Sequence, residues 1–136
     1  MKPNPIVWFE IYVQDMARAA KFYETVFQCT LESLPAPDNA GAADNADASA
    51  GTIMMAFPMS MEATGAGGML VQMKGVSSGG GGTLVYFGCE DCAVEQGRVE
   101  AAGGQIHRAK FSIGQYGQCA LVSDTEGNMI GLHSMQ

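Results

Sequence analysis

The second half of the chain repeats the pattern of the first half. A shift of 76 residues places Asp15 on Asp91 and Trp8 on Leu84. In each half an apolar segment is followed by an Asp, an amphipathic segment and further short apolar segments. Internal repetition of this kind indicates two copies of one supersecondary unit. The sequence therefore predicts an α+β fold built from two βαβββ modules.

The first module is expected over residues 5–74. Ile6–Val13 is rich in β-branched and aromatic residues, which favours a strand. Asp15 is a suitable N-cap, and apolar residues at three- and four-residue steps predict an amphipathic helix over Met16–Phe27. An Ala/Asp/Asn tract at Asp38–Gly51 has no apolar face and predicts an acidic loop. Three further strands are expected at Cys29–Leu34, Thr52–Phe57 and Gly68–Lys74.

A Gly/Ser-rich segment, residues 75–82, separates the modules and has the composition of a flexible linker. The second module is expected over residues 83–134. Thr83–Cys89 predicts a strand, Asp91 an N-cap, and the helix that follows should close at the glycine pair 103–104. Gln105–Lys110 predicts a short exposed strand, and we assign no role to its His107.

The segment Gly117–Ser134 predicts a β-hairpin. Two apolar runs, Cys119–Val122 and Met129–Leu132, flank a polar turn. Gly127 can adopt a positive φ without a Cβ clash, and the carboxylate of Asp124 can accept the free N–H groups of the turn. The turn is therefore specified by side-chain chemistry.

Composition bounds the class of protein. The 136 residues include 47% apolar residues, enough for one domain with a core, and the net charge is −7. This charge argues against nucleic-acid binding and favours neutral or cationic ligands. No apolar run of membrane-spanning length and no secretion signal is present, so we expect a cytoplasmic protein with reduced thiols and no membrane partner.

Methionines are concentrated in one part of the chain. Six of the ten lie within one twenty-residue span. Flexible thioethers of this kind can line an adaptable apolar cavity, or they can simply fill gaps in the core. The six residues are Met54, Met55, Met59, Met61, Met69 and Met73.

Three motifs, in this order, give the chain a family resemblance: the segment 7–16 (VWFEIYVQDM), Ala19–Tyr23 (AAKFY), and residues 124–132 (DTEGNMIGL). Together they resemble the vicinal oxygen chelate superfamily, which includes glyoxalase I, extradiol dioxygenases and the fosfomycin- and bleomycin-resistance proteins. The resemblance covers nearly the whole chain. It implies one domain over residues 1–136, with the two modules forming a curved mixed sheet around a cavity.

In metal-using members the resemblance implies four ligands, His, Glu or Gln, that converge inside the curved sheet. Three of these positions fall on Trp8, Leu84 and Gly131, and the fourth on Val71, or on Gln72 if the register slips by one residue. The first three carry no side chain that binds a hard or borderline cation, and a single Gln would not hold an ion. We therefore expect neither a metal nor another cofactor.

Strand alternation suggests what else lines the cavity. If Trp8 faces inward, so do Glu10 and Tyr12, and likewise Tyr86 accompanies Leu84 and His133 accompanies Gly131. Glu10 and His133 are candidates for a catalytic acid/base pair, or for a structural pair that closes the sheet. The candidate ligand-binding residues are Trp8, Tyr12, Tyr86, Met69 and Met73.

Cys89 and Cys92 form a CxxC motif where a strand meets a helix. A helix N-terminus lowers a thiol pKa, but the adjacent Glu90 and Asp91 oppose thiolate formation, and no second pair completes a zinc site. The resemblance favours a metal-free protein of the bleomycin-resistance type, a homodimer that binds or sequesters a small molecule. The alternatives are a metal-independent lyase or isomerase that uses Glu10 and His133, and a thiol switch.

Overall fold

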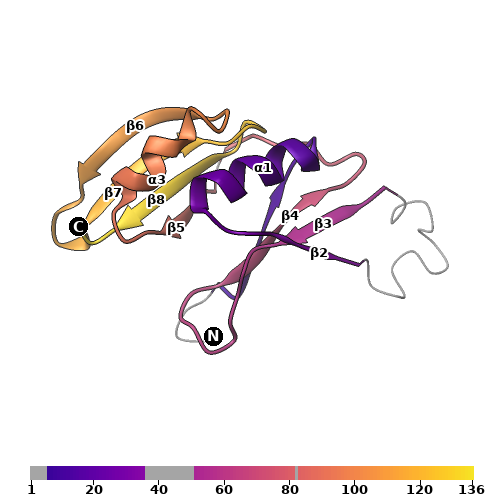
Figure 1. The fold of residues 1–136 in the computed structure, drawn as a ribbon, viewed down its shortest axis with the longest axis horizontal. Coiled ribbons are helices and arrows are strands. Elements are labelled where there is room, and N and C mark those ends of the chain that lie inside the picture. The colour runs from indigo at the N-terminus through magenta and orange to yellow at the C-terminus, as the bar shows by residue number, and fades with distance from the viewer. Residues whose placement is uncertain (1–5, 36–50, 82) are drawn as a thin grey trace. The chain divides into compact units, whose positions relative to one another are not determined.

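The computed structural model describes residues 6–35, 51–81 and 83–136 (Figure 1). It confirms the α+β class, with two βαβββ modules that each form a four-stranded mixed sheet. Most of the predicted loop at Asp38–Gly51 lies outside the described residues. The first module consists of β1 (Trp8–Tyr12), α1 (Met16–Phe27), β2 (Glu32–Leu34), β3 (Ile53–Ala56) and β4 (Gly67–Gln72). The second consists of β5 (Val85–Gly88), α3 (Cys92–Val99), β6 (Gln105–Ser112), the short 3₁₀ helix η1 (Gly114–Tyr116), β7 (Gln118–Ser123) and β8 (Met129–Ser134).

The two sheets have the same topology. The strand order is β1-β4-β3-β2 in the first sheet and β5-β8-β7-β6 in the second. In each sheet the first and last strands of the module pair in parallel, with Glu10 opposite Met69 and Tyr86 opposite Gly131. The shared order gives a structural basis to the repeat read from the sequence.

The described chain divides into two compact units. The first contains the residues up to Ala20 and Cys29–Ser78, and the second contains Lys21–Gln28 and the chain from Gly79 onward. Helix α1 contributes Met16–Ala20 to the first unit and Lys21–Phe27 to the second. Neither helix in the described part of the chain has the length and apolar character needed to cross a bilayer.

Both helices begin at the predicted Asp caps. Asp15 Oδ1 accepts a hydrogen bond from the backbone N–H of Arg18 (3.1 Å), and Asp91 Oδ1 accepts one from Ala93 (3.0 Å). These carboxylates satisfy N–H groups that lack a partner within the helix. Beyond α3, Gly103 adopts φ +98° and the backbone N–H of Gly104 reaches the carbonyl of Val99, as expected for a glycine C-cap.

In the second unit, α1 packs through aromatic side chains. Tyr23 is fully buried, and its ring centroid lies 5.9 Å from that of Phe87 on β5, with Phe27 stacked on the same ring at 4.5 Å. The Tyr23 hydroxyl donates to Asp124 Oδ2 at 2.7 Å. This hydrogen bond joins the Phe-Tyr pair of the helix to the turn of the last hairpin.

The predicted hairpin and its turn are confirmed. Strands β7 and β8 pair in antiparallel register, and Gly127 has φ +83°. Asp124 Oδ1 accepts from the backbone N–H groups of Glu126 and Asn128, each at 2.8 Å, and Oδ2 accepts from the Asn128 side chain at 3.1 Å. Asp124 is buried, so these donors replace the water that its charge would otherwise need.

Strand ends and the linker differ from the sequence predictions. β1 is shorter than Ile6–Val13, and Ile6 and Val7 are about two-thirds exposed. β6 runs to Ser112, two residues beyond its predicted end, with register shifts on either side of Arg108. The 75–82 linker has no helix or strand in its described part, yet Gln14 Nε2 donates to the Val76 carbonyl (3.1 Å) and Asn128 Oδ1 accepts from Gly79 N–H (2.8 Å). Each end is therefore tied to its own unit.

Candidate functional site

One face of the first sheet carries the predicted aromatic and acidic residues, and we call it the Trp8 face. Trp8, Glu10 and Tyr12 alternate along β1, so their side chains lie on the same side. The Trp8 indole N–H donates to Glu10 Oε2 (3.2 Å), and the Tyr12 hydroxyl donates to Oε1 (2.8 Å). The hydrogen bond to Glu10, followed by partial burial and the Glu10 charge, raises the pKa of Tyr12. The carboxylate is thus held between two aromatic side chains at the surface.

A row of residues crosses the Trp8 face from one edge strand to the other. Glu10 pairs with Met69, Met69 with Ala56, and Ala56 with Glu32 on β2. Residues that are directly opposite point to the same side of a sheet. Both carboxylates are exposed, while Met69 and Ala56 are buried between them. The face is therefore an apolar floor with an acidic group at each edge.

Two predicted ligand-contacting methionines belong to this floor. Met69 and Val71 form a buried cluster with Ala56, against which Tyr12 and the half-buried Met73 pack. By contrast, Met59 and Met61 are exposed, at 49% and 99%. Some of the methionines thus fill gaps in the buried cluster, one of the two roles considered from the sequence, whereas Met59 and Met61 lie at the surface.

Two cavities open beside the Trp8 face. One, of about 450 Å³, is lined by Trp8, Gly67 and the segment 59–65 except Glu62, and the other, of about 530 Å³, by Glu32, Leu34 and Ala56 among others. Met59 lines both, and it sits so close to Gly67 that a Cβ there would lie 2.9 Å from its sulfur. Each cavity lies in the size range of small-molecule pockets, roughly 300–1,000 Å³.

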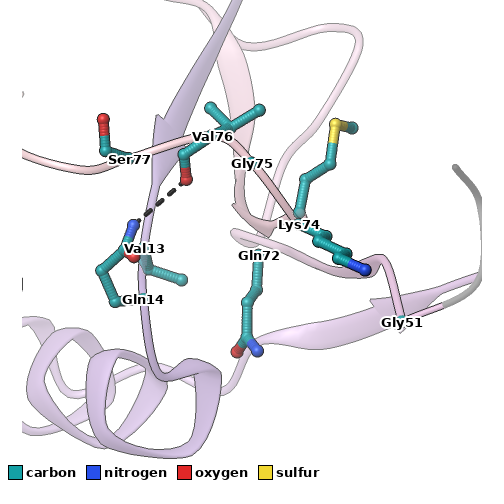
Figure 2. A pocket seen from close by; sticks show the side chains of 9 residues that line it. Val13, Gln14, Gly51, Gln72, Lys74, Gly75, Val76 and Ser77 are labelled. Carbon is teal, nitrogen blue, oxygen red and sulfur yellow. Dashed lines mark hydrogen bonds between the residues drawn. The ribbon is translucent and has the colours of Figure 1, made fainter.

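A third cavity, of about 450 Å³, lies where β1 and β4 end and was not anticipated from the sequence (Figure 2). Gln14 reaches across it to the carbonyl of Val76, as the dashed line shows, and the Gln72 amide extends toward the first turn of α1. Gln72 Oε1 accepts from the backbone N–H of Met16 at 2.7 Å. These amides hold the segment after β4 and the start of α1 in place, which is a structural role.

The second sheet carries Tyr86 and His133 on one face. The Tyr86 ring lies directly over Gly131, where any Cβ would overlap it. His133 lies two residues further along β8, and its Nε2 is 2.6 Å from the carbonyl oxygen of Tyr116. Because a carbonyl only accepts hydrogen bonds, this nitrogen carries the proton. No sequence signal for this contact exists, since η1 was not predicted.

The CxxC cysteines are free thiols. Cys92 is buried, and its backbone N–H donates to the Ser134 hydroxyl at 3.0 Å. The pKa of Cys89 is raised to about 12, chiefly by burial. The negative charge of Glu95 and a hydrogen bond with its side chain also raise it. This environment does not favour the thiolate that redox chemistry requires.

Comparisons with known proteins bear on both the N-terminal segment and the fold. Residues 5–41 match the family model described as bleomycin resistance protein-like N-terminal. No curated protein matches the sequence. The fold is similar to that of a V278E mutant of glyoxalase I from Zea mays, with a TM-score of 0.70 and 22% identity over 98% of this chain. The chain spans about half of that enzyme, 47% of its length.

Two similar structures match the chain over nearly their whole length. TnmS3, an antibiotic-binding protein from Streptomyces sp. CB03234, aligns over 98% of both chains with a TM-score of 0.60 and 20% identity. A glyoxalase/bleomycin resistance protein/dioxygenase family enzyme from Burkholderia phytofirmans PsJN covers 95% of this chain and 97% of its own, with a TM-score of 0.62 and 12% identity. The chain has the vicinal oxygen chelate fold. The resemblance drawn from the sequence motifs is confirmed.

The positions that correspond to metal ligands in this superfamily carry other functions here. The Trp8 indole is hydrogen-bonded to Glu10, and the Tyr86 ring packs directly against Gly131. Val71 is buried in the cluster with Ala56 and Met69. Leu84 precedes β5 and has no donor atom, and Gln72 caps α1. Across the described residues no group of three or more His, Cys, Asp or Glu side chains is placed to hold a metal. The donor set of a vicinal oxygen chelate metal centre does not fit these residues.

The predicted site residues of this chain fall into two groups. Trp8, Glu10 and Tyr12 are brought together, with Met69 and Met73 beside them in the first unit. Tyr86 and His133 share a face of the second sheet. Glu10 and His133 belong to different units, and each is hydrogen-bonded within its own. Their pairing as acid and base stays a prediction.

Proposed function

We propose that the protein binds a small neutral or cationic molecule on the Trp8 face and sequesters it without a metal. The observation that carries this proposal is the Glu10 carboxylate held between Trp8 and Tyr12. A carboxylate fixed beside two aromatic rings offers a cationic ligand both charge and π contacts. The antibiotic-binding neighbour TnmS3 supports a binding role for this fold, and the ligand is a proposal of our own.

The shape and charge of the face support the same ligand class. Glu10 and Glu32 stand at opposite edges of an apolar floor, and cavities of small-molecule size adjoin both edges. A net charge of −7 adds long-range attraction for cations. An aromatic amine, with one flat apolar part and one charged end, is complementary to this arrangement. Candidate contacts are Trp8, Glu10, Tyr12, Met69 and Met73, which all belong to the first unit.

Hydrogen bonding favours binding over the acid/base alternative. Each Glu10 oxygen already accepts one hydrogen bond, so a proton taken from a substrate would have to share an oxygen with the Trp8 indole or the Tyr12 hydroxyl. His133 Nε2 is likewise committed to the Tyr116 carbonyl. A catalytic pair of Glu10 and His133 remains the alternative, and loss of turnover in both Glu10→Gln and His133→Ala, once a substrate is known, would establish it. The raised pKa of Cys89 disfavours the thiolate, so the thiol switch is the least favoured of the three hypotheses.

The test uses Trp8, the single tryptophan, as the reporter. A panel of aromatic amines and neutral aromatic compounds, antibiotics included, is titrated while Trp8 fluorescence and the melting temperature are followed. We expect amines to quench Trp8, and Glu10→Gln to weaken amine binding about fivefold or more while neutral compounds are little affected. Glu100→Gln is the matched control, because it removes one exposed negative charge from the other unit.

Equal amine affinities in Glu10→Gln and the parent protein would overturn this proposal.

We also propose that the protein is a cytoplasmic homodimer, by analogy with the superfamily. Sedimentation velocity at micromolar concentration tests the homodimer, and a single species of monomer mass would contradict it.

A further inference from the structure

The strands of the two sheets carry opposite charges. Among the described strands, those of the first sheet contain Glu10 and Glu32 and no Lys, Arg or His. The strands of the second sheet contain Arg108, Lys110 and two histidines and neither Asp nor Glu. The modules are repeats with the same topology, so the two sheets differ in charge at equivalent positions. The second sheet is therefore suited to a ligand of opposite charge.

One row of the second sheet combines an aromatic ring with a guanidinium group. Tyr86 on β5 pairs with Gly131, Gly131 with Leu121, and Leu121 with Arg108 on β6. Helix α3 packs against one side of this sheet (Figure 1). Val122 and Ile130 are buried, and Leu121 and Gly131 are their neighbours along the strands, so the row lies on the opposite side, away from α3. We call this side the Arg108 face. Strands β5 and β6, at the two edges of this sheet, are three strand spacings apart, about 14 Å. This leaves room for one small ring system between the side chains of Tyr86 and Arg108.

Arg108 is stacked on an aromatic ring, and its guanidinium donors have no acceptor among the described residues. Its Cζ lies 3.6 Å from the centroid of the Phe111 ring, so the guanidinium is stacked on the same face. In the described part of the chain no carboxylate forms an ion pair with it, whereas Lys110 is paired with Asp91 at 2.9 Å. Register shifts occur on both sides of Arg108, and such bulges redirect side chains and are common next to functional sites. A stacked guanidinium presents a planar fork that fits a carboxylate.

Tyr86 forms the other end of the row. Its ring rests on Gly131, which weakens a strand interior but here allows the ring to lie flat against the sheet. The ring is nevertheless 49% exposed. A half-exposed aromatic ring in line with the Arg108 guanidinium is an arrangement suited to a flat anion.

We propose that the Arg108 face of the second sheet is a ligand site that takes a planar aromatic carboxylate. The carboxylate accepts two hydrogen bonds from Arg108, and the ring of the ligand stacks on Tyr86 above Leu121. The site is lined by no carboxylate of the second sheet, so its charge selects for anions in a protein that is acidic overall. This site does not depend on the function proposed for the first sheet.

Three matched probes test the proposal: 2-naphthoate, its neutral carboxamide, and 2-naphthylmethylammonium. Binding is followed in ¹⁵N-labelled protein by backbone amide shifts. We expect 2-naphthoate to shift the amides of Tyr86, Gly131 and Arg108, and the carboxamide to bind more weakly. Arg108→Ala should weaken 2-naphthoate about tenfold or more, and Arg108→Lys should give an intermediate affinity because it keeps the charge but not the fork. Tyr86→Phe should retain binding, and Tyr86→Ala should weaken it.

Lys21→Ala is the control, because it removes one exposed positive charge from α1 without altering the sheet. The proposal is overturned if Arg108→Ala binds 2-naphthoate as tightly as Lys21→Ala does, or if the carboxamide binds as tightly as the carboxylate. Shifts confined to the first sheet would also overturn it. The ammonium probe reports on the Trp8 face in the same sample, so failure of one site is distinguishable from failure of the other.

Discussion

The Cys89 thiol is half-buried and faces the carboxylate of Glu95, whose Oε1 is buried without a hydrogen-bond partner in the described residues. Burial and this charge both disfavour the thiolate and raise the pKa to about 12. The thiol therefore stays protonated throughout the physiological range.

Alkylation rates measure this directly, since only the thiolate reacts with iodoacetamide. At pH 8 we expect Cys89 to react roughly a thousandfold more slowly than an ordinary exposed thiol, because its pKa lies some three units higher. The rate, followed by peptide mass spectrometry, should rise tenfold per pH unit up to pH 11. Glu95→Gln should speed the reaction by removing the nearby charge, and a plateau below pH 10 would contradict the raised pKa.

Helix α1 and the last hairpin are joined by one buried hydrogen bond. The Tyr23 hydroxyl is a donor to the buried Asp124 carboxylate, whose other partners lie within the turn itself. Burial, the charge of Asp124 and this hydrogen bond raise the pKa of Tyr23 well above its usual value of 10.0. The Phe-Tyr pair and the Asp-x-x-Gly-Asn turn, two motifs far apart in the sequence, are thus parts of one contact.

Tyr23→Phe should lower the free energy of unfolding by ~2 kcal/mol, because it removes a donor from a buried carboxylate. Urea unfolding at pH 7 measures the change, and Tyr116→Phe, at an exposed ring, should change it by less than about 0.5 kcal/mol. Since the native pKa of Tyr23 is raised, its contribution is complete below about pH 10, the unfolded value, and is lost as the pH rises further. A Tyr23→Phe effect as small as the control would show that water replaces the hydroxyl.

Elements were predictable where their signals are local. The caps at Asp15 and Asp91, the helix over Met16–Phe27 and the Asp124 turn follow from short-range periodicity and hydrogen bonding, and all are found. Strand ends were less predictable, because a strand ends where its partner does. Ile6 and Val7 have β-favouring side chains, but in the described structure they lie outside the sheet.

The candidate site was predictable only along single strands. Alternation placed Trp8, Glu10 and Tyr12 together, since all three lie on β1. The seat of Tyr86 on Gly131 depends on the register between β5 and β8, which no local pattern encodes. Likewise, Arg108 stacks on Phe111 in a part of β6 where the register shifts, and no local pattern encodes these shifts. A glycine that reads as a missing ligand is instead a support for an aromatic ring.

At the scale of the whole chain, α1 is the element that both units share. Residues Met16–Ala20 belong to the first unit and Lys21–Phe27 to the second, within one continuous helix. Most of the second half, Tyr23 included, is held by contacts in the second unit. Helix formation is cooperative, so unfolding of the second unit, with Lys21–Phe27, should also destabilise Met16–Ala20 in the first unit.

We therefore expect the two units to unfold in one transition. Trp8 fluorescence reports on the first unit, and alkylation of the buried Cys119 during urea unfolding reports on the second. In Tyr23→Phe, a change confined to the second unit, both midpoints should fall together. If the Cys119 midpoint fell while the Trp8 midpoint stayed at its parent value, the units would be independent domains, and α1 would unfold from its second half alone.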